Sequence, residues 1–335
     1  MDGGGGGGGV GEELTAQETA LYDRQIRVWG VDAQRRLSKS HVLVSGMTGS
    51  TVEFCKNIVL AGVGSLTLMD DRPVTENAIQ ANFLIPPDET KWEEGSIAKL
   101  CCDSLKEFNP MVYVSVEKGK GENALQSFKL CLRNQTERSD PSSFEEEFFD
   151  KFDAVVVSCC SLATKKEINN KCRRRPKRIA FYTVDCRGSC GEIFADLQNY
   201  AYVQEVIALP WRNLPRKVAK LYFAMRVIEN FEESAGRKPG EISHSDLPNV
   251  LALQKQVCEA QSFNDSFIPA SLLERLLMAG TEEYPPVCAI LGGILGQEVI
   301  KGLSGKGDPF KNFFFFDTTD GKGVIEDITP ATPPN

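Results

Sequence analysis

Short apolar runs alternate with helical segments between residues 41 and 197, and this rhythm is the strongest constraint on the fold. The runs are HVLVS (41–45), SLTLMD (65–70), VYVSV (112–116), DAVVVSCC (153–160) and IAFYTVD (179–185). The segments between them, such as 50–61 and 95–108, have the patterning of helices. Strands that alternate with helices in this way form a parallel sheet with right-handed crossovers.

The rhythm changes after GEIFADL (191–197), and the chain then reads as helices up to about residue 284. A long apolar helix opening on Pro286 and two strand-like runs, NFFFFD and GVIEDI, complete it. We therefore predict an α/β fold with a Rossmann-like, doubly wound, mostly parallel sheet. The predicted parts are a disordered glycine-rich tail (1–14), a core (15–198), a helical insertion (199–284), a return to the core (285–328) and a tail (329–335).

Charge and cysteine usage exclude several classes of protein. The net charge of −8 argues against binding nucleic acid through a general electrostatic field. Eleven cysteines without a C-x-x-C pair predict neither a disulfide framework nor a cysteine-rich zinc site, and they indicate a reducing compartment. The pairs Cys101–Cys102 and Cys159–Cys160 lie in apolar runs and are predicted to be buried thiols. The chain shows no signal peptide and no uninterrupted apolar run of membrane-spanning length, so we expect neither secretion nor a membrane span.

Two further segments have simple structural interpretations. The polar stretch 120–151 is predicted to be helical, with the acidic cluster Glu145–Glu147 on a solvated face. The helix that opens on Pro286 is apolar on most faces, and its small residues permit another element to approach closely. These small residues are Ala289, Gly292, Gly293 and Gly296.

The strand–turn–helix at 42–61 is where a nucleotide-binding glycine loop would lie. A G-x-G-x-x-G loop needs its later glycines for contact with phosphate and for close helix packing. Here Gly46-Met-Thr-Gly-Ser-Thr keeps the first glycine and Gly49, but Thr48 and Thr51 occupy the second and third glycine positions. Asp70, which ends the second strand, could still bind a ribose hydroxyl. From these residues alone, a turn kept for folding is the simpler interpretation.

The segment before the first strand has a capping box, with Thr15 as N-cap and Glu18 three residues later. It predicts a helix that ends near Gly30, followed by a short helix capped by Asp32. The helix carries Arg24 among aromatic residues, and on spacing alone an ion pair with Asp23 or Glu18 is the simplest role for it.

Four stretches together resemble one family. They are YDRQIRVWG (22–30), KNIVLAGVGSLTLMDD (56–71), ANFLI (81–85) and PPVCAILGGILGQEVIKGLSG…NFFFFD (285–317). They are similar to the enzymes that activate ubiquitin-like proteins, and most closely to the small subunit of the SUMO-activating enzyme. The similarity runs from about Thr15 to Ile328. Of these motifs, AGVGSLTLMD is shared with bacterial adenylating enzymes of sulfur-carrier pathways, whereas YDRQIR and NFFFFD are narrower.

The resemblance implies a pseudo-symmetric heterodimer of two related adenylation domains. One subunit binds ATP and Mg²⁺, adenylates the modifier and carries the thioester cysteine, whereas the other has lost those parts. In this chain the Asp-x-Asp motif ends in Arg72, the arginine of Asn-Arg-Gln-Phe-Leu is Ala81, and the Mg²⁺-binding aspartate aligns with Ser161. The degenerate site then comprises Gly46, Thr48, Gly49, Thr51, Asp70, Arg72, Ala81 and Ser161. We therefore expect no ATP or metal bound in cis and no adenylation by the isolated chain.

By the same resemblance, Arg24 reaches across the dimer to the ATP bound by the partner, and Arg27 has a structural role at the interface. The expected partners are the cysteine-bearing catalytic subunit and SUMO, with no nucleic acid or membrane. Cys258 lies mid-helix and is expected to be structural. The isolated His41 and His244 are too few for a metal site.

Nuclear residence, with the cytoplasm as a second location, is expected from the family. The run Lys171–Arg178 resembles a nuclear-import signal, although a solvated basic turn is the simpler interpretation.

Three alternative functions remain open on the sequence. The first is the equivalent subunit for NEDD8, which usually carries a longer insertion than 199–284. The second is a homodimeric sulfur-carrier adenylating enzyme, which needs the arginine and aspartate that are absent at Ala81 and Ser161. The third is a nicotinamide-dependent oxidoreductase, against which Thr48 and Thr51 count.

Overall fold

The computed structural model describes residues 14–92, 95–117, 141–198, 211, 214–215, 217–280 and 282–328. The expectations for the two tails, apart from residue 14, lie outside these ranges. So does the helix expected over 120–140. The described end of that segment forms short 3₁₀ helices, so the expected α-helix does not extend over 141–151.

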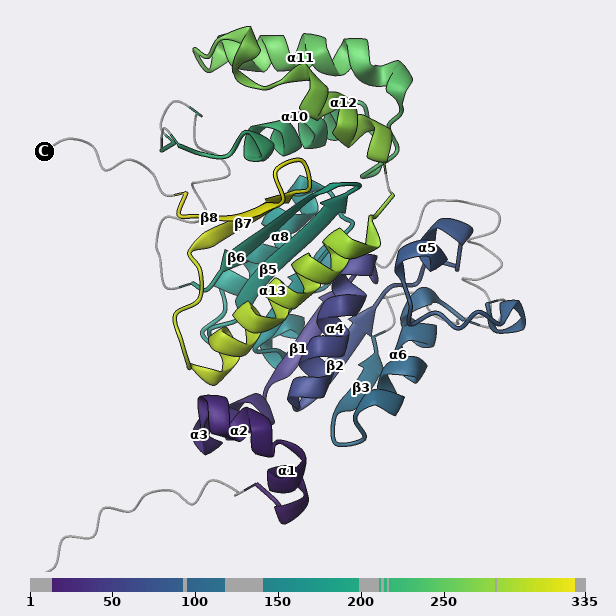
Figure 1. The fold of residues 1–335 in the computed structure, drawn as a ribbon, viewed down its shortest axis with the longest axis vertical. Helices are drawn as coiled ribbons and strands as arrows, with labels where there is room; N and C mark the ends of the chain where they lie inside the picture. The colour runs from purple at the N-terminus through teal and green to yellow at the C-terminus, as the bar shows by residue number, and fades with distance from the viewer. Residues whose placement is uncertain are drawn as a thin grey trace, which may run out of the picture.

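An eight-stranded sheet forms the centre of the molecule, in the order β3-β2-β1-β4-β5-β6-β7-β8 (Figure 1). Its strands are β1 (His41–Ser45), β2 (Ser65–Met69), β3 (Tyr113–Val116), β4 (Ala154–Val157), β5 (Ala180–Arg187), β6 (Cys190–Asp196), β7 (Asn312–Asp317) and β8 (Lys322–Glu326). The pairs from β3 to β5 are parallel, whereas β6, β7 and β8 join by antiparallel pairs. The predicted mostly parallel α/β fold is confirmed.

Helices cover both faces of the sheet. The α-helices are α1 (Ala16–Leu21), α2 (Asp23–Trp29), α3 (Val31–Leu37), α4 (Gly49–Ala61), α5 (Glu76–Ala81), α6 (Ile97–Phe108), α8 (Leu162–Arg173), α10 (Lys220–Ser234), α11 (Leu247–Ala260), α12 (Ala270–Ala279) and α13 (Pro285–Ser304). The 3₁₀ helices are η1 (Glu89–Lys91), η2 (Pro141–Ser143), η3 (Glu146–Lys151), η5 (His244–Asp246) and η6 (Asp265–Phe267). Helices α4, α6 and α13 lie on the near face in Figure 1, with α8 behind the sheet and α1–α3 at one end.

The alternation of side chains along each strand builds two hydrophobic cores from one sheet. In β1, Val42 and Val44 join the core under α4, α6 and α13, whereas Leu43 joins the core on the other face. The aromatic run of β7 divides in the same way, with Phe314 facing α13 and Phe313 facing α10. A strand that is buried on both faces needs a continuous apolar run, which is why NFFFFD lies inside the sheet.

The N-terminal segment differs from its prediction at two points. The capping box of Thr15 and Glu18 is present, but the expected single helix breaks into α1 and α2 at Tyr22. The Tyr22 ring is buried, and its hydroxyl accepts a hydrogen bond of 2.9 Å from Asn109 Nδ2. The helix therefore breaks at the residue whose ring is buried in the core. The cap of α3 is Gly30 and not Asp32, which instead pairs with an arginine one turn along α3.

Helix α13 packs directly on α4 through two of its four small residues, Gly292 and Gly296, whereas Ala289 and Gly293 face outward. A Cβ on Gly292 would lie 2.4 Å from Glu53 Cβ and 2.8 Å from Phe54 N, whereas a Cβ on Gly293 would meet nothing within 4 Å. By length and composition α13 could also cross a membrane, although half of its most apolar window is buried. Its packing against α4 and the sheet identifies it as a core helix.

The acidic cluster Glu145–Glu147 lies at the surface, with Glu145 and Glu147 exposed as expected, and its segment also pairs with the basic run Lys171–Arg178. Arg174 pairs with Glu146 at 2.6 Å, and Arg175 pairs with Asp150 at 2.7 Å. The basic run therefore closes onto the acidic 3₁₀ helix η3, because opposite charges from two neighbouring segments face each other.

Helix α10 is held to the core by buried ion pairs. Arg187 on β5 donates two hydrogen bonds of 2.8 Å to Glu232 on α10. Lys165 on α8 lies 2.7 Å from Asp185 and 3.0 Å from Glu229 on α10. Charges this deeply buried are tolerated only when paired, so these contacts define how α10 sits on the core.

We predict that replacing Gly292 with alanine destabilises the protein, because the added methyl group would collide with the α4 backbone. The free energy of unfolding should fall by about 1–3 kcal/mol. Gly293→Ala is the matched control, and it should leave stability unchanged or raise it by up to about 1 kcal/mol through better helix propensity. Urea denaturation of the two variants makes the comparison, and an equal effect at both positions would contradict the packing described.

We also predict that Glu229 makes stability depend on pH. Burial raises its pKa, but Arg226 and Lys165 outweigh burial and bring the pKa to about 2. Because the folded-state pKa lies below the unfolded one, Glu229 stabilises the fold above the unfolded pKa, and this contribution is lost as the pH falls through the folded pKa. The advantage of wild type over Glu229→Gln in unfolding free energy should therefore shrink by about 1–3 kcal/mol between about pH 6 and pH 3.

Thermal or denaturant melts over this pH range provide the measurement. The exposed Glu259 on α11 offers a control, because Glu259→Gln should follow the wild type at every pH. A constant difference between wild type and Glu229→Gln would mean that the carboxylate does not carry the pH dependence.

Candidate functional site

The loop between β1 and α4 is shaped by the chain that packs around it. Gly46 has φ +85°, and a Cβ there would lie 2.4 Å from the carbonyl oxygen of Ser158. A Cβ on Gly49 would lie 2.8 Å from both Ala81 Cβ and Cys288 Sγ. Close packing within this chain therefore requires glycine at both retained positions.

The backbone N–H groups of this loop are satisfied by side chains of the same chain. Met47 N donates to Asp70 Oδ2 at 2.7 Å, and Gly49 N donates to Glu283 Oε2 at 2.6 Å. Thr48 N donates to Thr51 Oγ1 at 2.7 Å. In a nucleotide-binding loop, N–H groups at the start of the helix bind phosphate. In this protein internal acceptors take that place.

The two threonines complete the internal network. Thr51 Oγ1 donates to Gly46 O at 2.7 Å. The hydroxyl of Thr48 lies 3.2 Å from that of Ser158, across the mouth of the loop. The residues that replace the glycines of the motif therefore tie β1, α4 and β4 together.

Asp70 is engaged by Arg72, the residue that departs from the Asp-x-Asp motif. Arg72 Nε donates to Asp70 Oδ1 at 2.8 Å, and a second guanidinium nitrogen reaches the other carboxylate oxygen. Burial alone would lower the pKa of Arg72, but the Asp70 carboxylate outweighs it and holds the pKa above its ordinary value. A carboxylate bound in this way, and also by Met47 N, has its lone pairs occupied within the chain.

The other two substituted positions have structural roles. Ala81 ends α5 and packs against Gly49. Ser161 is the N-cap of α8, and its hydroxyl accepts a hydrogen bond of 3.1 Å from Thr164 N. The structure thus gathers Gly46–Thr51, Asp70, Arg72 and Ala81 around one loop, while Ser161 caps a neighbouring helix.

The cysteine pairs differ in burial. Cys101 and Cys102 are buried, as predicted, but Cys159 and Cys160 are only half-buried. They follow the end of β4, where the chain leaves the sheet, and the Cys159 thiol accepts a hydrogen bond of 3.3 Å from Arg72. Cys258 is buried on α11, and burial raises its pKa, which is the opposite of what an activated nucleophile needs.

Arg24 lies exposed on α2. Over the described ranges it has no ion pair, because Asp23 pairs with Arg27 at 2.8 Å and Glu18 caps its own helix at Thr15. The ion pair considered on spacing alone is therefore absent from this part of the chain, and the role of Arg24 toward a partner stays a prediction.

A sequence model of the ThiF family matches residues 22–334. The chain belongs to the ThiF family. Its relatives include SUMO-activating enzyme subunits 1B-1 and 1A of Arabidopsis thaliana, both 59% identical, over 95% and 96% of this chain and 98% of each relative. SUMO-activating enzyme subunit 1 of Rattus norvegicus is 31% identical over 96% of this chain and 97% of its own. The resemblance to the small subunit of the SUMO-activating enzyme is thereby confirmed.

A solved structure supports the same fold for this ThiF-family chain. The crystal structure of SeMet PaaA superposes with a TM-score of 0.58 at 15% identity, covering 96% of this chain and 76% of that one. At this identity the likeness concerns the fold alone.

The sequence provided no indication of Glu283, whose carboxylate accepts the hydrogen bond from Gly49 N at the start of α4 in this ThiF-family protein. It lies at the end of the segment predicted as an insertion, 234 residues from Gly49. No local motif marks it, because its role depends on the chain returning to the start of α4. Burial raises the pKa of this carboxyl, although the N–H groups of Gly49 and Ser50 act in the opposite direction.

We predict that the contacts of Asp70 contribute to stability. Asp70→Asn keeps the shape but removes the charge that holds Arg72, so the free energy of unfolding should fall by about 1–3 kcal/mol. Asp103→Asn is the control, because Asp103 also forms ion pairs, with Lys99 and Lys106, but all three side chains are exposed. That change should cost no more than about 0.5 kcal/mol. Equal losses in chemical denaturation would contradict a structural role for the Asp70 pair.

Proposed function

We propose that this chain is the regulatory, non-cysteine subunit of a heterodimeric SUMO-activating enzyme, and that it completes the ATP site of a catalytic partner with Arg24. The names of its relatives support the enzyme class, since proteins 59% and 31% identical to it are SUMO-activating enzyme subunits. The ATP and Mg²⁺ of the reaction would be bound by the partner, which would also carry the thioester cysteine.

The internal bonding of the degenerate site supports a non-catalytic role. The N–H groups of Met47, Thr48 and Gly49 bind protein acceptors, and Asp70 is held by Arg72. A nucleotide would have to break several of these bonds before it could make its own. A self-sufficient homodimeric adenylating enzyme needs this site open, so the same observation counts against that alternative.

The surroundings of Arg24 carry the proposal for its action in trans. Its exposed neighbours along the chain include three apolar side chains besides the ion pair of Asp23 and Arg27: Leu21 is 52% exposed, Val28 76% and Val31 43%. An exposed apolar patch of this kind marks a surface that another protein covers. A guanidinium in such a patch presents a fork of donors that suits phosphate oxygens.

The outer face of α13 and α4 offers a second part of the interface. Ile290 is 38% exposed, Leu60 on α4 is 44% exposed and Phe83 is 48% exposed. Up to Glu298 the helix α13 has no charged residue, and its outward positions include Ala289 and Gly293. Helices α13 and α4 lie side by side in front of the sheet in Figure 1. A catalytic subunit of related fold would cover this apolar surface.

Residence in the nucleus, with the cytoplasm as a second location, remains part of the proposal. The run Lys171–Arg178 is less accessible than a free basic tail, because Arg174 and Arg175 pair with acidic residues of η3. This pairing favours a structural role for the run over a nuclear-import signal.

We predict that Arg24→Ala lowers ATP-dependent SUMO adenylation and thioester formation by about ten- to a hundred-fold when this chain is mixed with its catalytic partner. An arginine donated in trans is worth more in GTPases, roughly 10³–10⁵ in rate. This chain alone should be inactive, and so should the partner alone. Arg27→Ala is the comparison on the same helix: as an interface residue without contact to ATP, it should weaken complex formation but retain most of the activity once the complex is saturated.

Gel filtration of the mixtures separates assembly from chemistry. Normal complex formation with reduced adenylation by Arg24→Ala would support the proposal. Activity from this chain alone would instead favour the homodimeric adenylating enzyme. Equal activity with NEDD8 in place of SUMO would favour the alternative subunit.

A further inference from the structure

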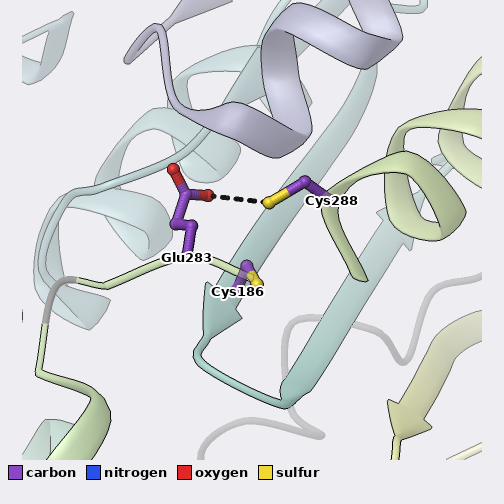
Figure 2. A group of neighbouring side chains, drawn as sticks. All are labelled: Cys186, Glu283 and Cys288. Carbon is purple, nitrogen blue, oxygen red and sulfur yellow. Dashed lines mark hydrogen bonds between the residues drawn. The ribbon is translucent and has the colours of Figure 1, made fainter. Parts of the chain in front are cut away.

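Three potential metal ligands converge beside the degenerate loop. Cys186 lies near the end of β5, Glu283 precedes α13, and Cys288 lies in the first turn of α13 (Figure 2). One ligand atom from each lies within 4.8 Å of the other two. The Cys288 Sγ and Glu283 Oε1 atoms are already 3.7 Å apart.

Thiolates and carboxylates are both ligand types that bind zinc. Zn–S bonds are about 2.3 Å and Zn–O bonds about 2.0–2.2 Å, so neighbouring ligand atoms of a tetrahedral site lie about 3.3–3.8 Å apart. The distance between Cys288 and Glu283 falls in this range. The third ligand, Cys186, needs only a small side-chain adjustment to complete three corners of the tetrahedron.

The environment of Glu283 orients it for ligation. Its Oε2 atom accepts the hydrogen bond of 2.6 Å from Gly49 N, and its Oε1 atom is directed to the Cys288 thiol (Figure 2). A hydrogen bond to the far oxygen of a carboxylate ligand is the usual way in which a protein fixes such a ligand. Two thiolates and a carboxylate leave a net charge of −1 around Zn²⁺, which the N-terminus of α4 and the nearby Arg72 offset.

We propose that Cys186, Glu283 and Cys288 bind one Zn²⁺ ion, with a water molecule as the fourth ligand. Binding replaces the two thiol protons, which pass to solvent. The ion would join β5, the end of the helical segment and the start of α13 at the degenerate loop. It would be a structural clip, independent of the heterodimer and of Arg24.

This site is not visible in the sequence. The absence of a C-x-x-C pair predicts no cysteine-rich zinc site, and Cys186 lies almost a hundred residues before Glu283 and Cys288. The antiparallel end of the sheet and the return of α13 bring them together.

The test is zinc binding to the reduced, full-length chain, followed by competition with a chromogenic chelator. We expect one equivalent of Zn²⁺ in the wild type and at least a tenfold loss of affinity in Cys186→Ser and Glu283→Gln. Cys172→Ser and Cys258→Ser are matched controls, since both thiols are buried elsewhere, and they should bind as the wild type does. Zinc should also raise the Tm of the wild type by a few degrees and leave that of Cys288→Ser unchanged.

Cobalt gives a second readout that does not depend on stability. Co²⁺ bound to the wild type should show a thiolate-to-metal charge-transfer band that Cys186→Ser and Cys288→Ser each weaken. Equal zinc affinity in wild type, Cys186→Ser and Glu283→Gln would overturn the proposal. A reduced wild-type chain that binds no zinc would also overturn the proposal. The same holds if Cys186 and Cys288 form a disulfide and the chain still binds no metal after that disulfide is reduced.

Discussion

The donors at the start of α4 need acceptors, and much of the structure follows from how this chain supplies them. Glu283 accepts from Gly49 and Asp70 accepts from Met47, and Arg72 in turn holds Asp70. Buried N–H groups without partners are costly, and side chains of this chain supply the acceptors at this loop. The residues that depart from the nucleotide-binding motif therefore stabilise the fold around the loop.

Paired charges are buried in the core, whereas the guanidinium of Arg24 is exposed at the surface. The buried ion pairs of Arg187, Lys165 and Arg226 join α10 to β5, α8 and β6. Arg24 is exposed on α2, which lies at the opposite end of the molecule from α10 (Figure 1), and the apolar Leu21 and Val28 are exposed near it in the chain.

The sequence alone was enough for the architecture. Apolar runs that alternate with helical segments predict a parallel sheet, since each run must be covered on both faces. Local signals also gave the capping box at Thr15 and the small-residue face of α13, which Gly292 confirms. The substitutions at Thr48, Arg72 and Ala81 were readable because they fall inside known motifs. These features can be predicted from the sequence because each depends on residues that are neighbours along the chain.

Tertiary structure decided whatever depends on segments distant in the chain. The break of the first helix accompanies the burial of Tyr22 against Asn109, and the basic run closes on η3 because the two segments face each other. Glu283 reaches Gly49 across 234 residues, and Cys186 meets Cys288 only because α13 returns to the sheet. By itself the sequence determined the elements, their order and the loss of the nucleotide motif. Only the tertiary structure decided which side chains accept hydrogen bonds from the N–H groups of that loop, because these contacts join residues that no local pattern connects.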